Sequence, residues 1–375
     1  LKLFFKTMKI TKFFALLCAV AVGFVACEPV QNGPEPEPKP EPSGKITLSA
    51  DDTAIQLGES VTFTVTDQAG TDVTSAASFY DNNMDQVSNP FTPAASGNYT
   101  IMATIGAESS NNVTITVMAE MPEIPEDPEP SNLKFNHRAL VIDHTGVNCG
   151  YCPMMTESLL LLEESKWHGY YNEVTCHAGG MAGGDPANST AANVLNKMQK
   201  PNGYPNVNIN FYTAVVGNYG GQTTVNKIGS ALDSYLKKDG ADVGISMAID
   251  GDETQLYCAA QIKAAVQNEY KVVAWLLESG IYSPNQAGAS KDIHRIYNYA
   301  LRNISGSYSE TNVQGESIGV LKVGDTYDCA FQLPITSTKW KYENMGVLVI
   351  VSAKDANNRW EVVNSLYCNL SEKSK

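Results

Sequence analysis

The spacing of hydrophobic and polar residues changes along the chain, and each spacing predicts a different kind of element. Between residues 45 and 118, apolar and polar residues alternate in short stretches such as Val61–Val65 and Val113–Val117. This two-residue repeat is typical of strands with one buried face. Turn-forming residues separate the stretches, for example around Gly58 and Gly97. Because no helical stretch interrupts them, the segment is predicted to be a β-sandwich of about 75 residues.

A second pattern begins near residue 133. The apolar run Ala139–Ile142 has the length and β-branched content of a strand buried on both faces. Thr145 and Gly146 then turn the chain, and a helix is predicted from Tyr151 onward. Strands and helices keep alternating up to residue 239, which predicts an α/β sheet with helices on both faces. The later elements are a strand at Glu173–His177, a helix at Asn188–Lys200 with Ser189 as its N-cap, a strand at Asn206–Tyr212 and a helix at Thr223–Lys237.

Residues 240–375 return to a strand pattern. Asp250–Glu253 is predicted to turn the first of several hairpins, so this part is expected to form a second β-sandwich. Three cysteines fall on positions that face its predicted core. We expect mostly buried thiols there, with at most one disulfide among them. These cysteines are Cys258, Cys329 and Cys368.

The N-terminal residues have the pattern of a secretory signal. Lys9 and Lys12 precede an apolar run, Phe13–Ala26, which is shorter than the roughly 18 residues of a membrane-spanning helix. Cys27 follows a small residue directly, as in a lipoprotein, where the cysteine is acylated and becomes the mature N-terminus. The alternative is an ordinary signal peptide followed by an incidental cysteine.

Two segments rich in proline and glutamate, residues 27–44 and 119–132, separate the predicted folded parts. Such segments are extended, with about 3.1 Å per residue in polyproline II form, and cannot build a core. The chain is therefore predicted to consist of a signal peptide (1–26), a tether (27–44), a β-sandwich (45–118), a linker (119–132), an α/β domain (133–239) and a β-sandwich domain (240–375).

The net charge limits the partners of the chain. A formal charge of −14, with no basic stripe, argues against binding nucleic acid and against docking on anionic lipid by charge. Contact with a membrane is therefore expected through the lipid on Cys27. No motif requires a cofactor.

The most informative motif is the pair Cys149 and Cys152, set between the predicted central strand and helix. In that context the Cys-x-x-Cys spacing indicates redox chemistry, because the start of a helix stabilises a thiolate. We expect the Cys149 sulfur to point outward and attack, and Cys152 to lie one turn further in and resolve. A structural zinc site would need a second ligand pair at short spacing, which the sequence lacks. An inert structural disulfide remains the other alternative.

Residues around this pair resemble the thioredoxin family. Asp143 lies six residues before Cys149, where thioredoxins place a buried acid behind the second cysteine. Gly203–Val207 is similar to the cis-proline turn that faces the dithiol in that fold. The resemblance implies that Asp143 exchanges a proton with Cys152 and that Pro205 is cis. The alternative for Asp143 is a carboxylate that caps the end of the strand.

The same resemblance implies where a substrate would touch the chain. In thioredoxins the backbone of the residue before the cis-proline contacts the substrate peptide, which here is Tyr204. Gly150 and Tyr151, between the two cysteines, complete the predicted substrate-binding residues. His144 is expected to be structural, Cys176 a packing residue and His177 a surface residue. The alternative is that Cys176 or His177 approaches the dithiol.

Two further resemblances concern the chain outside this site. The stretch Thr145-Gly-Val-Asn-Cys-Gly-Tyr-Cys-Pro153 in a lipoprotein resembles the Bacteroidetes outer-membrane family Omp28, over about residues 133–372. The strands of residues 45–118 resemble bacterial immunoglobulin-like modules without the Cys-Trp-Cys core, which favours a spacer over a ligand-binding module.

Two functions follow as hypotheses. The first is an outer-membrane lipoprotein, on the periplasmic or the surface face, that exchanges disulfides with the thiols of exported proteins. The second is a non-catalytic surface adhesin or binding lipoprotein that uses the thioredoxin fold as a scaffold, since a fold does not imply a function.

Overall fold

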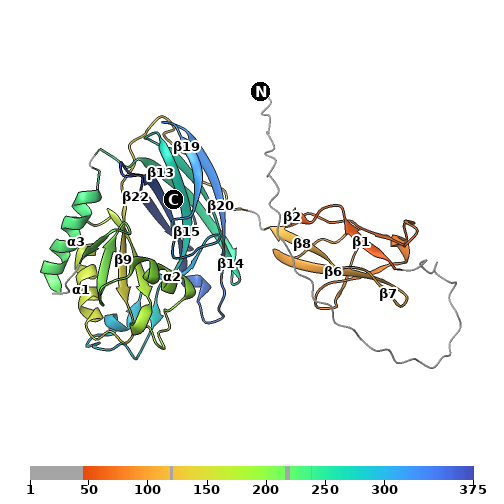
Figure 1. Cartoon of the computed structure of the whole chain (residues 1–375), viewed down its shortest axis with the longest axis horizontal. Helices are drawn as coiled ribbons and strands as arrows, with labels where there is room; N and C mark the ends of the chain where they lie inside the picture. Colours follow the sequence, from red (N-terminus) through yellow and green to blue (C-terminus); the bar gives the residue numbers. More distant parts are fainter. Residues whose placement is uncertain (1–44, 119–120, 216–219, 238) are drawn as a thin grey trace. The chain divides into compact units, whose positions relative to one another are not determined.

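Figure 1 shows the computed structural model of the chain, which describes residues 45–118, 121–215, 220–237 and 239–375. The predicted signal peptide, the tether and Cys27 lie outside the described residues. The chain divides into two compact units. Among the described residues, the first contains 45–93 together with Asn98–Thr116, and the second contains Ala94–Gly97 and the residues from Val117 onward.

The first unit consists of short strands in two small sheets. β1 (Thr47–Ala50) pairs with β3 (Phe63–Thr66), and the second sheet has the order β2-β8-β6-β4-β5, with β7 beside β6. The ring of Phe63 stacks on Phe79 and Phe91 in the core, with centroids 5.3 and 6.3 Å apart. The β-rich character predicted for this segment is confirmed. The remaining strands are β2 (Ala54–Gln56), β4 (Ser78–Tyr80), β5 (Gln86–Val87), β6 (Gly97–Ile105), β7 (Glu108–Ser109) and β8 (Val113–Met118).

The second unit is built on a nine-stranded sheet with the order β12-β11-β9-β10-β18-β15-β21-β22, in which β19 also pairs with β15. A separate three-stranded sheet, β13-β14-β20, lies over part of it. The strands are β9 (Ala139–Thr145), β10 (Tyr171–His177), β11 (Asn206–Ile209), β12 (Thr213–Val215), β13 (Val243–Asp252), β14 (Gln255–Ala264), β15 (Asn268–Glu278), β16 (Ile281–Tyr282), β17 (Ile296–Tyr297), β18 (Ala300–Ile304), β19 (Glu316–Leu321), β20 (Thr326–Pro334), β21 (Met345–Lys354) and β22 (Trp360–Asn369).

The first four strands of this sheet carry the helices. β9 runs parallel to β10 and antiparallel to β11, and β12 returns antiparallel to β11. Apolar residues of α1 (Cys152–Glu163) and α3 (Gly221–Tyr235) pack on one face with Val141, and those of α2 (Thr190–Gln199) pack on the other with Ile142. Alternate residues of β9 thus bury opposite faces, as a central strand requires.

In the second half of the sheet, one face is covered by other strands instead of by a helix. Alternate residues of β15 and β21 face the sheet β13-β14-β20, and Tyr270, Leu276 and Val349 belong to the apolar core between these two layers. The residues between them point the other way. Trp275 and Leu348 join the same core as Ile142 and α2.

This shared core differs from the predicted division at residues 239 and 240. Strands from both sides of that position form one sheet, and Ile142 and Trp275 are buried in one hydrophobic cluster. The two predicted domains therefore belong to one compact unit. The change from an α/β to an all-β pattern marks where the layer covering the sheet changes, not where the sheet ends.

Two local predictions have different outcomes. Ser189 is the N-cap of α2, and its side chain accepts a hydrogen bond from Ala192 N, as predicted. The single strand predicted at 206–212 is instead two strands, β11 and β12, joined by a tight turn. Asn210 and Phe211 adopt positive φ angles of 46° and 74°, which ends the first strand.

The linker is bound to the second unit at one point. The ammonium group of Lys263, whose side chain is 9% exposed, lies 2.7 Å from Asp127 Oδ2 and donates to Pro130 O at 2.5 Å. Part of the segment predicted to lie apart from both domains is therefore held on β14.

Candidate functional site

The two cysteines lie where β9 passes into α1, as the pattern predicts. Gly146 makes the turn after β9, and a Cβ there would stand 2.6 Å from the backbone of Met181, so only glycine fits. Cys149 N donates to Gly146 O, and α1 begins at Cys152. Cys149 and Cys152 form a disulfide with their Cα atoms 5.4 Å apart.

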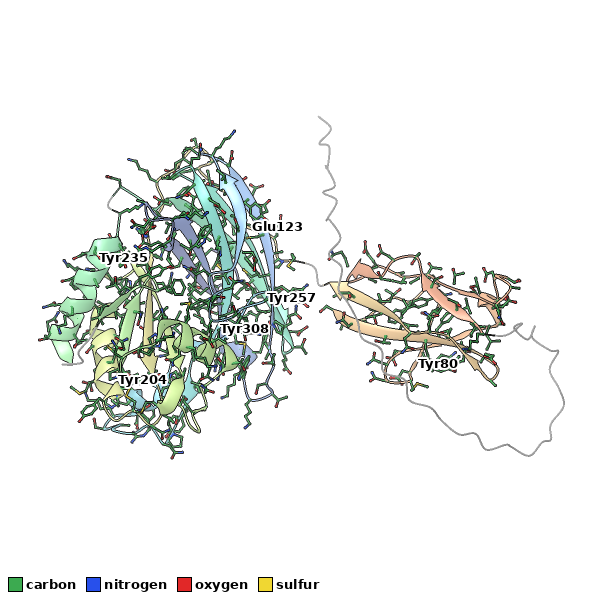
Figure 2. All side chains as sticks on the ribbon, viewed as in Figure 1. Tyr80, Glu123, Tyr204, Tyr235, Tyr257 and Tyr308 are labelled. Carbon is green, nitrogen blue, oxygen red and sulfur yellow. A yellow bond between two sulfur atoms is a disulfide. The ribbon has the colours of Figure 1, made fainter. Side chains whose placement is uncertain are left out.

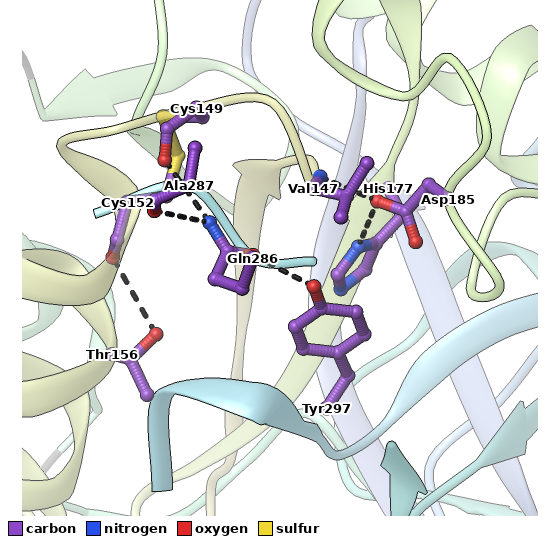
Figure 3. The surroundings of a disulfide bond; sticks show 9 residues. All are labelled: Val147, Cys149, Cys152, Thr156, His177, Asp185, Gln286, Ala287 and Tyr297. Carbon is purple, nitrogen blue, oxygen red and sulfur yellow. Dashed lines mark hydrogen bonds and ion pairs between the residues drawn. A yellow bond between two sulfur atoms is a disulfide. The ribbon is translucent and has the colours of Figure 1, made fainter. Parts of the chain in front are cut away.

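The expected outward position of the Cys149 sulfur is wrong. Cys149 is 3% exposed and Cys152 is 2% exposed. The cover is a loop of residues 283–295, here called the strap, which connects β16 to β17. Gln286 Nε2 donates to Cys149 O at 3.1 Å (Figure 3). Ala287 N donates to Val147 O at 2.8 Å.

The strap is fixed at both ends and at its middle. Ser283 N donates to Arg295 O where the strap begins and ends. His294, which is buried, places Nε2 2.9 Å from Glu157 Oε1 on α1, and Lys291 Nζ lies 2.7 Å from the same oxygen. The disulfide is therefore enclosed between its own helix and a segment more than 130 residues away along the chain.

Behind the strap lies a buried polar network (Figure 3). Tyr297 donates its hydroxyl hydrogen to Gln286 Oε1 at 2.7 Å, and its ring centroid lies 4.3 Å from that of His177. His177 Nδ1 lies 2.8 Å from Asp185 Oδ2, which also accepts from Val147 N. Although burial favours the neutral acid, the hydrogen bond from His177 holds the pKa of Asp185 below its ordinary value.

Asp143 and Cys152 line one cavity of about 330 Å³. Asp143 is 3% exposed, and its Oδ1 has no hydrogen-bond partner among the described residues. Burial, and next the charge of Glu173, raises the pKa of Asp143 well above its usual value of 3.8. Burial, and next the charge of Glu163, raises the pKa of Glu173 to about 7. Asp143 therefore does not cap the strand end, and its burial favours the protonated form of the carboxyl.

We expect Asp143→Asn to change the pH dependence of stability. A carboxyl whose pKa is raised on folding stabilises the protein fully below its unfolded value, and that contribution is lost as the pH rises through the folded value. Asparagine cannot ionise, so the variant gains stability relative to the wild type between pH 4 and pH 8. Thermal unfolding at both pH values measures this.

Asp185→Asn serves as the control, because the pKa of Asp185 is lowered and its contribution has the opposite sign. That variant is expected to lose more stability at pH 8 than at pH 4. A difference between Asp143→Asn and the wild type that stays constant with pH would contradict a raised pKa at Asp143.

The other predicted residues lie around a second, larger pocket of about 890 Å³, which Tyr151, Tyr204 and Pro205 line. The peptide bond before Pro205 is cis, as predicted. Tyr204, labelled in Figure 2, donates its hydroxyl hydrogen to Asn196 Oδ1 at 2.8 Å. Gly150 instead faces Gly288 of the strap in close contact.

The residues predicted to be structural lie mostly on the α2 face. His144 is fully buried, with Nε2 2.6 Å from Gln199 Oε1, and burial lowers its pKa to about 4. The thiol of Cys176 donates to Ala192 O. His177 faces the opposite side and joins the network behind the disulfide. The expectation that His177 lies at the surface is therefore wrong, because it is 1% exposed. Its partner Asp185 is eight residues away along the chain, whereas the ring of Tyr297 reaches it from β17.

The remaining cysteines of the described chain are thiols. Cys258 and Cys368 are buried, as expected, whereas Cys329 is half-buried. Burial raises the pKa of Cys368 to about 11 and that of Cys329 to about 12, so both stay protonated at neutral pH.

The described residues contain neither a candidate metal site nor a candidate membrane-spanning helix. No cluster of three or more histidine, cysteine or acidic side chains is arranged to hold a metal ion. Likewise, none of the helices in the described ranges is long and apolar enough to cross a membrane.

The second half of the chain is similar to a known protein family. Residues 192–368 match the model of the family described as outer membrane protein Omp28. The match covers slightly less than half of the chain, and it begins after both cysteines of the disulfide. No curated protein matches the chain.

Solved structures give a likeness of fold. HBP35 of Porphyromonas gingivalis aligns with a TM-score of 0.51 and 13% identity, over 64% of this chain and 76% of that one. A protein of Agrobacterium tumefaciens aligns at 0.39 and 17% identity, over 64% and 96%. A domain of the outer membrane lipoprotein Omp28 from Porphyromonas gingivalis aligns at 0.22 and 15% identity, over 34% and 88%. The first of these supports a shared fold.

Proposed function

We propose that this protein is an outer-membrane lipoprotein of the Omp28 type that exchanges disulfides with exported or surface proteins through Cys149 and Cys152. The region from β9 to α3 is proposed to be thioredoxin-like. Two features of this region support the proposal. Its four strands lie in the order β12-β11-β9-β10, with β9 and β10 parallel, and helices cover both faces of the sheet. The first unit is proposed to be an immunoglobulin-like spacer.

One observation carries the proposal: Asp143, buried and with an unpaired oxygen, lines the same cavity as Cys152. A protonated acid is needed there, because Cys152 is the sulfur that leaves when the disulfide opens. A structural disulfide needs no acid behind it, and burying one costs stability.

The exchange starts from the disulfide. A thiolate of a reduced substrate attacks the Cys149 sulfur, a substrate–Cys149 disulfide forms, and the bond to Cys152 breaks. Cys152 leaves as a thiolate and takes the proton of Asp143. A second substrate thiolate then displaces Cys149, so the substrate leaves with a disulfide and the pair keeps two electrons. The reverse sequence reduces a substrate disulfide.

Reduction of insulin by the purified full chain, with dithiothreitol as electron donor, tests the proposal. We expect the wild type to accelerate precipitation of the insulin B chain, and a Cys149→Ser/Cys152→Ser double variant to leave it at the rate of dithiothreitol alone. Equal rates for both proteins would reject exchange as the function.

A binding scaffold is the second candidate, and the burial of the disulfide favours it. With both cysteines at most 3% exposed, a protein substrate reaches Cys149 only after the strap moves. If the disulfide serves stability instead, the double variant will unfold at a lower temperature and neither protein will reduce insulin.

The location is proposed from Cys27. If the residue is acylated, cells given a palmitate analogue will label the wild type, and Cys27→Ala will carry no label and will leave the membrane fraction. A Cys18→Ala variant is the matched control, because Cys18 lies inside the proposed signal peptide. Equal labelling of wild type and Cys27→Ala would reject the anchor.

A further inference from the structure

A row of asparagines lies on one face of β11. The sequence Asn206-Val-Asn-Ile-Asn210 alternates amide and aliphatic side chains. Asn206 and Asn208 therefore share the face of β11 opposite Val207 and Ile209, and Asn210 follows directly after the strand. All three are buried, with exposed fractions of 6%, 4% and 0%. A strand in a sheet core would normally carry apolar residues at these positions, because a buried amide must find partners for its donors and acceptors.

The partners of the row are incomplete at its outer end. Asn210 accepts from Leu140 N at 2.7 Å and donates to Val362 O, so it is held within the sheet. Asn206 Nδ2 donates to Asn208 Oδ1 at 3.2 Å. Asn206 Oδ1 has no partner among the described residues. An unpaired buried acceptor costs about 1–3 kcal/mol, so a group outside the chain is expected to pair with this amide.

Asn206 and Asn208 both line the pocket of about 890 Å³. Its other walls carry the same chemistry, with further amides at Gln199, Asn202 and Gln314. Among the described residues that line it, Lys200 and Glu310 carry charge, and Glu310 lies 3.5 Å from Lys197 in an ion pair. A volume in this range is typical of pockets for small ligands.

Aromatic rings complete the pocket. Tyr151, Tyr204 and Tyr212 line it, and Tyr212 is held rigidly. Its hydroxyl donates to Trp360 O at 2.7 Å, and the guanidinium of Arg359 lies 5.3 Å from its ring centroid. A fixed tyrosine offers a flat apolar face beside polar groups at little entropic cost.

We propose that this pocket binds a neutral oligosaccharide. Side-chain amides both donate and accept, so a row of them matches adjacent hydroxyl groups, and tyrosine rings match the apolar face of a sugar ring. An anionic ligand would require a cluster of cations, whereas Lys200 is the cation among the described lining residues. A peptide is selected through apolar subpockets, and the aliphatic lining residues other than proline are Met198 and Ala214.

Isothermal titration of the purified full chain tests this with four neutral tetrasaccharides: cellotetraose, maltotetraose, mannotetraose and chitotetraose. We expect at least one to bind with a dissociation constant of about 1 mM or tighter. Tyr212→Ala and Asn202→Ala should each weaken that binding at least about tenfold, a loss of about 1.4 kcal/mol. Tyr282→Ala and Gln222→Ala, exposed residues outside the pocket, are the matched controls and should bind as the wild type does.

Three results would overturn the proposal. One is that none of the four sugars binds, and another is that binding is unchanged in both pocket variants. The third is that the pocket variants lose affinity for a neutral peptide rich in serine and asparagine while sugar binding stays intact. Melting temperatures equal to the wild type verify that the variants are folded. A Cys149→Ser variant should bind the sugar normally, which separates this site from disulfide exchange.

Discussion

A Cys152→Ser variant will accumulate a stable mixed disulfide between Cys149 and its substrate, whereas a Cys149→Ser variant will not. Without the Cys152 sulfur, the bond formed at Cys149 has no internal thiol to resolve it. Cys152 is 2% exposed and lines the cavity that holds Asp143, so we expect it to resolve the mixed disulfide instead of attacking. Incubation of each reduced variant with a disulfide-bonded peptide, followed by non-reducing mass spectrometry, measures the adduct. We expect at least about a hundredfold difference between the variants.

Cys258→Ser is the control for this experiment. Cys258 is a buried thiol on β14, outside the site, and its replacement should leave the wild-type pattern unchanged. Equal trapping by both active-site variants would mean that the two sulfurs are equivalent. Absence of any adduct would favour the binding scaffold over disulfide exchange.

Gln286→Ala will make the disulfide react with a reductant about ten times faster. The amide of Gln286 links Cys149 O to the hydroxyl of Tyr297, and its loss removes two buried hydrogen bonds that hold the strap closed. Each is worth about 1 kcal/mol, so the open state becomes about tenfold or more populated. The rate of reduction by a water-soluble phosphine, followed by trapping of the thiols, reports this population.

A second strap variant reaches the same state by a different route. Gly288 lies in close contact with Gly150 at a φ of 70°, so Gly288→Val should push the strap away and also accelerate reduction. Gln261→Ala is the matched control, because the amide of Gln261 donates a hydrogen bond to Asp328 in the sheet β13-β14-β20, away from the strap. An unchanged rate in both strap variants would show that the strap does not limit access.

Local signals in the sequence were sufficient for much of the site. The apolar run of β9, the turn at Gly146 and the cap at Ser189 are each decided by a few neighbouring residues, and each was predicted correctly. The buried position of Asp143 follows from the same strand. These elements place Cys152 and Asp143 in one cavity, which is the core of the candidate mechanism.

The features that could not be predicted from the sequence depend on contacts between residues far apart along the chain. Gln286 reaches Cys149 O from the strap, and Tyr297 of β17 holds that glutamine in turn. The shared core of Ile142 and Trp275 is similar, because two adjacent patterns do not reveal that their strands join one sheet.

The separation of Cys149 and Gln286 has a consequence in time. A protein exported from its N-terminus delivers the cysteine pair to the envelope 137 residues before the amide that covers it. If this chain is exported as proposed, the pair meets the oxidants and thiols of the compartment during that interval without its cover. Its disulfide then forms before the strap folds over it.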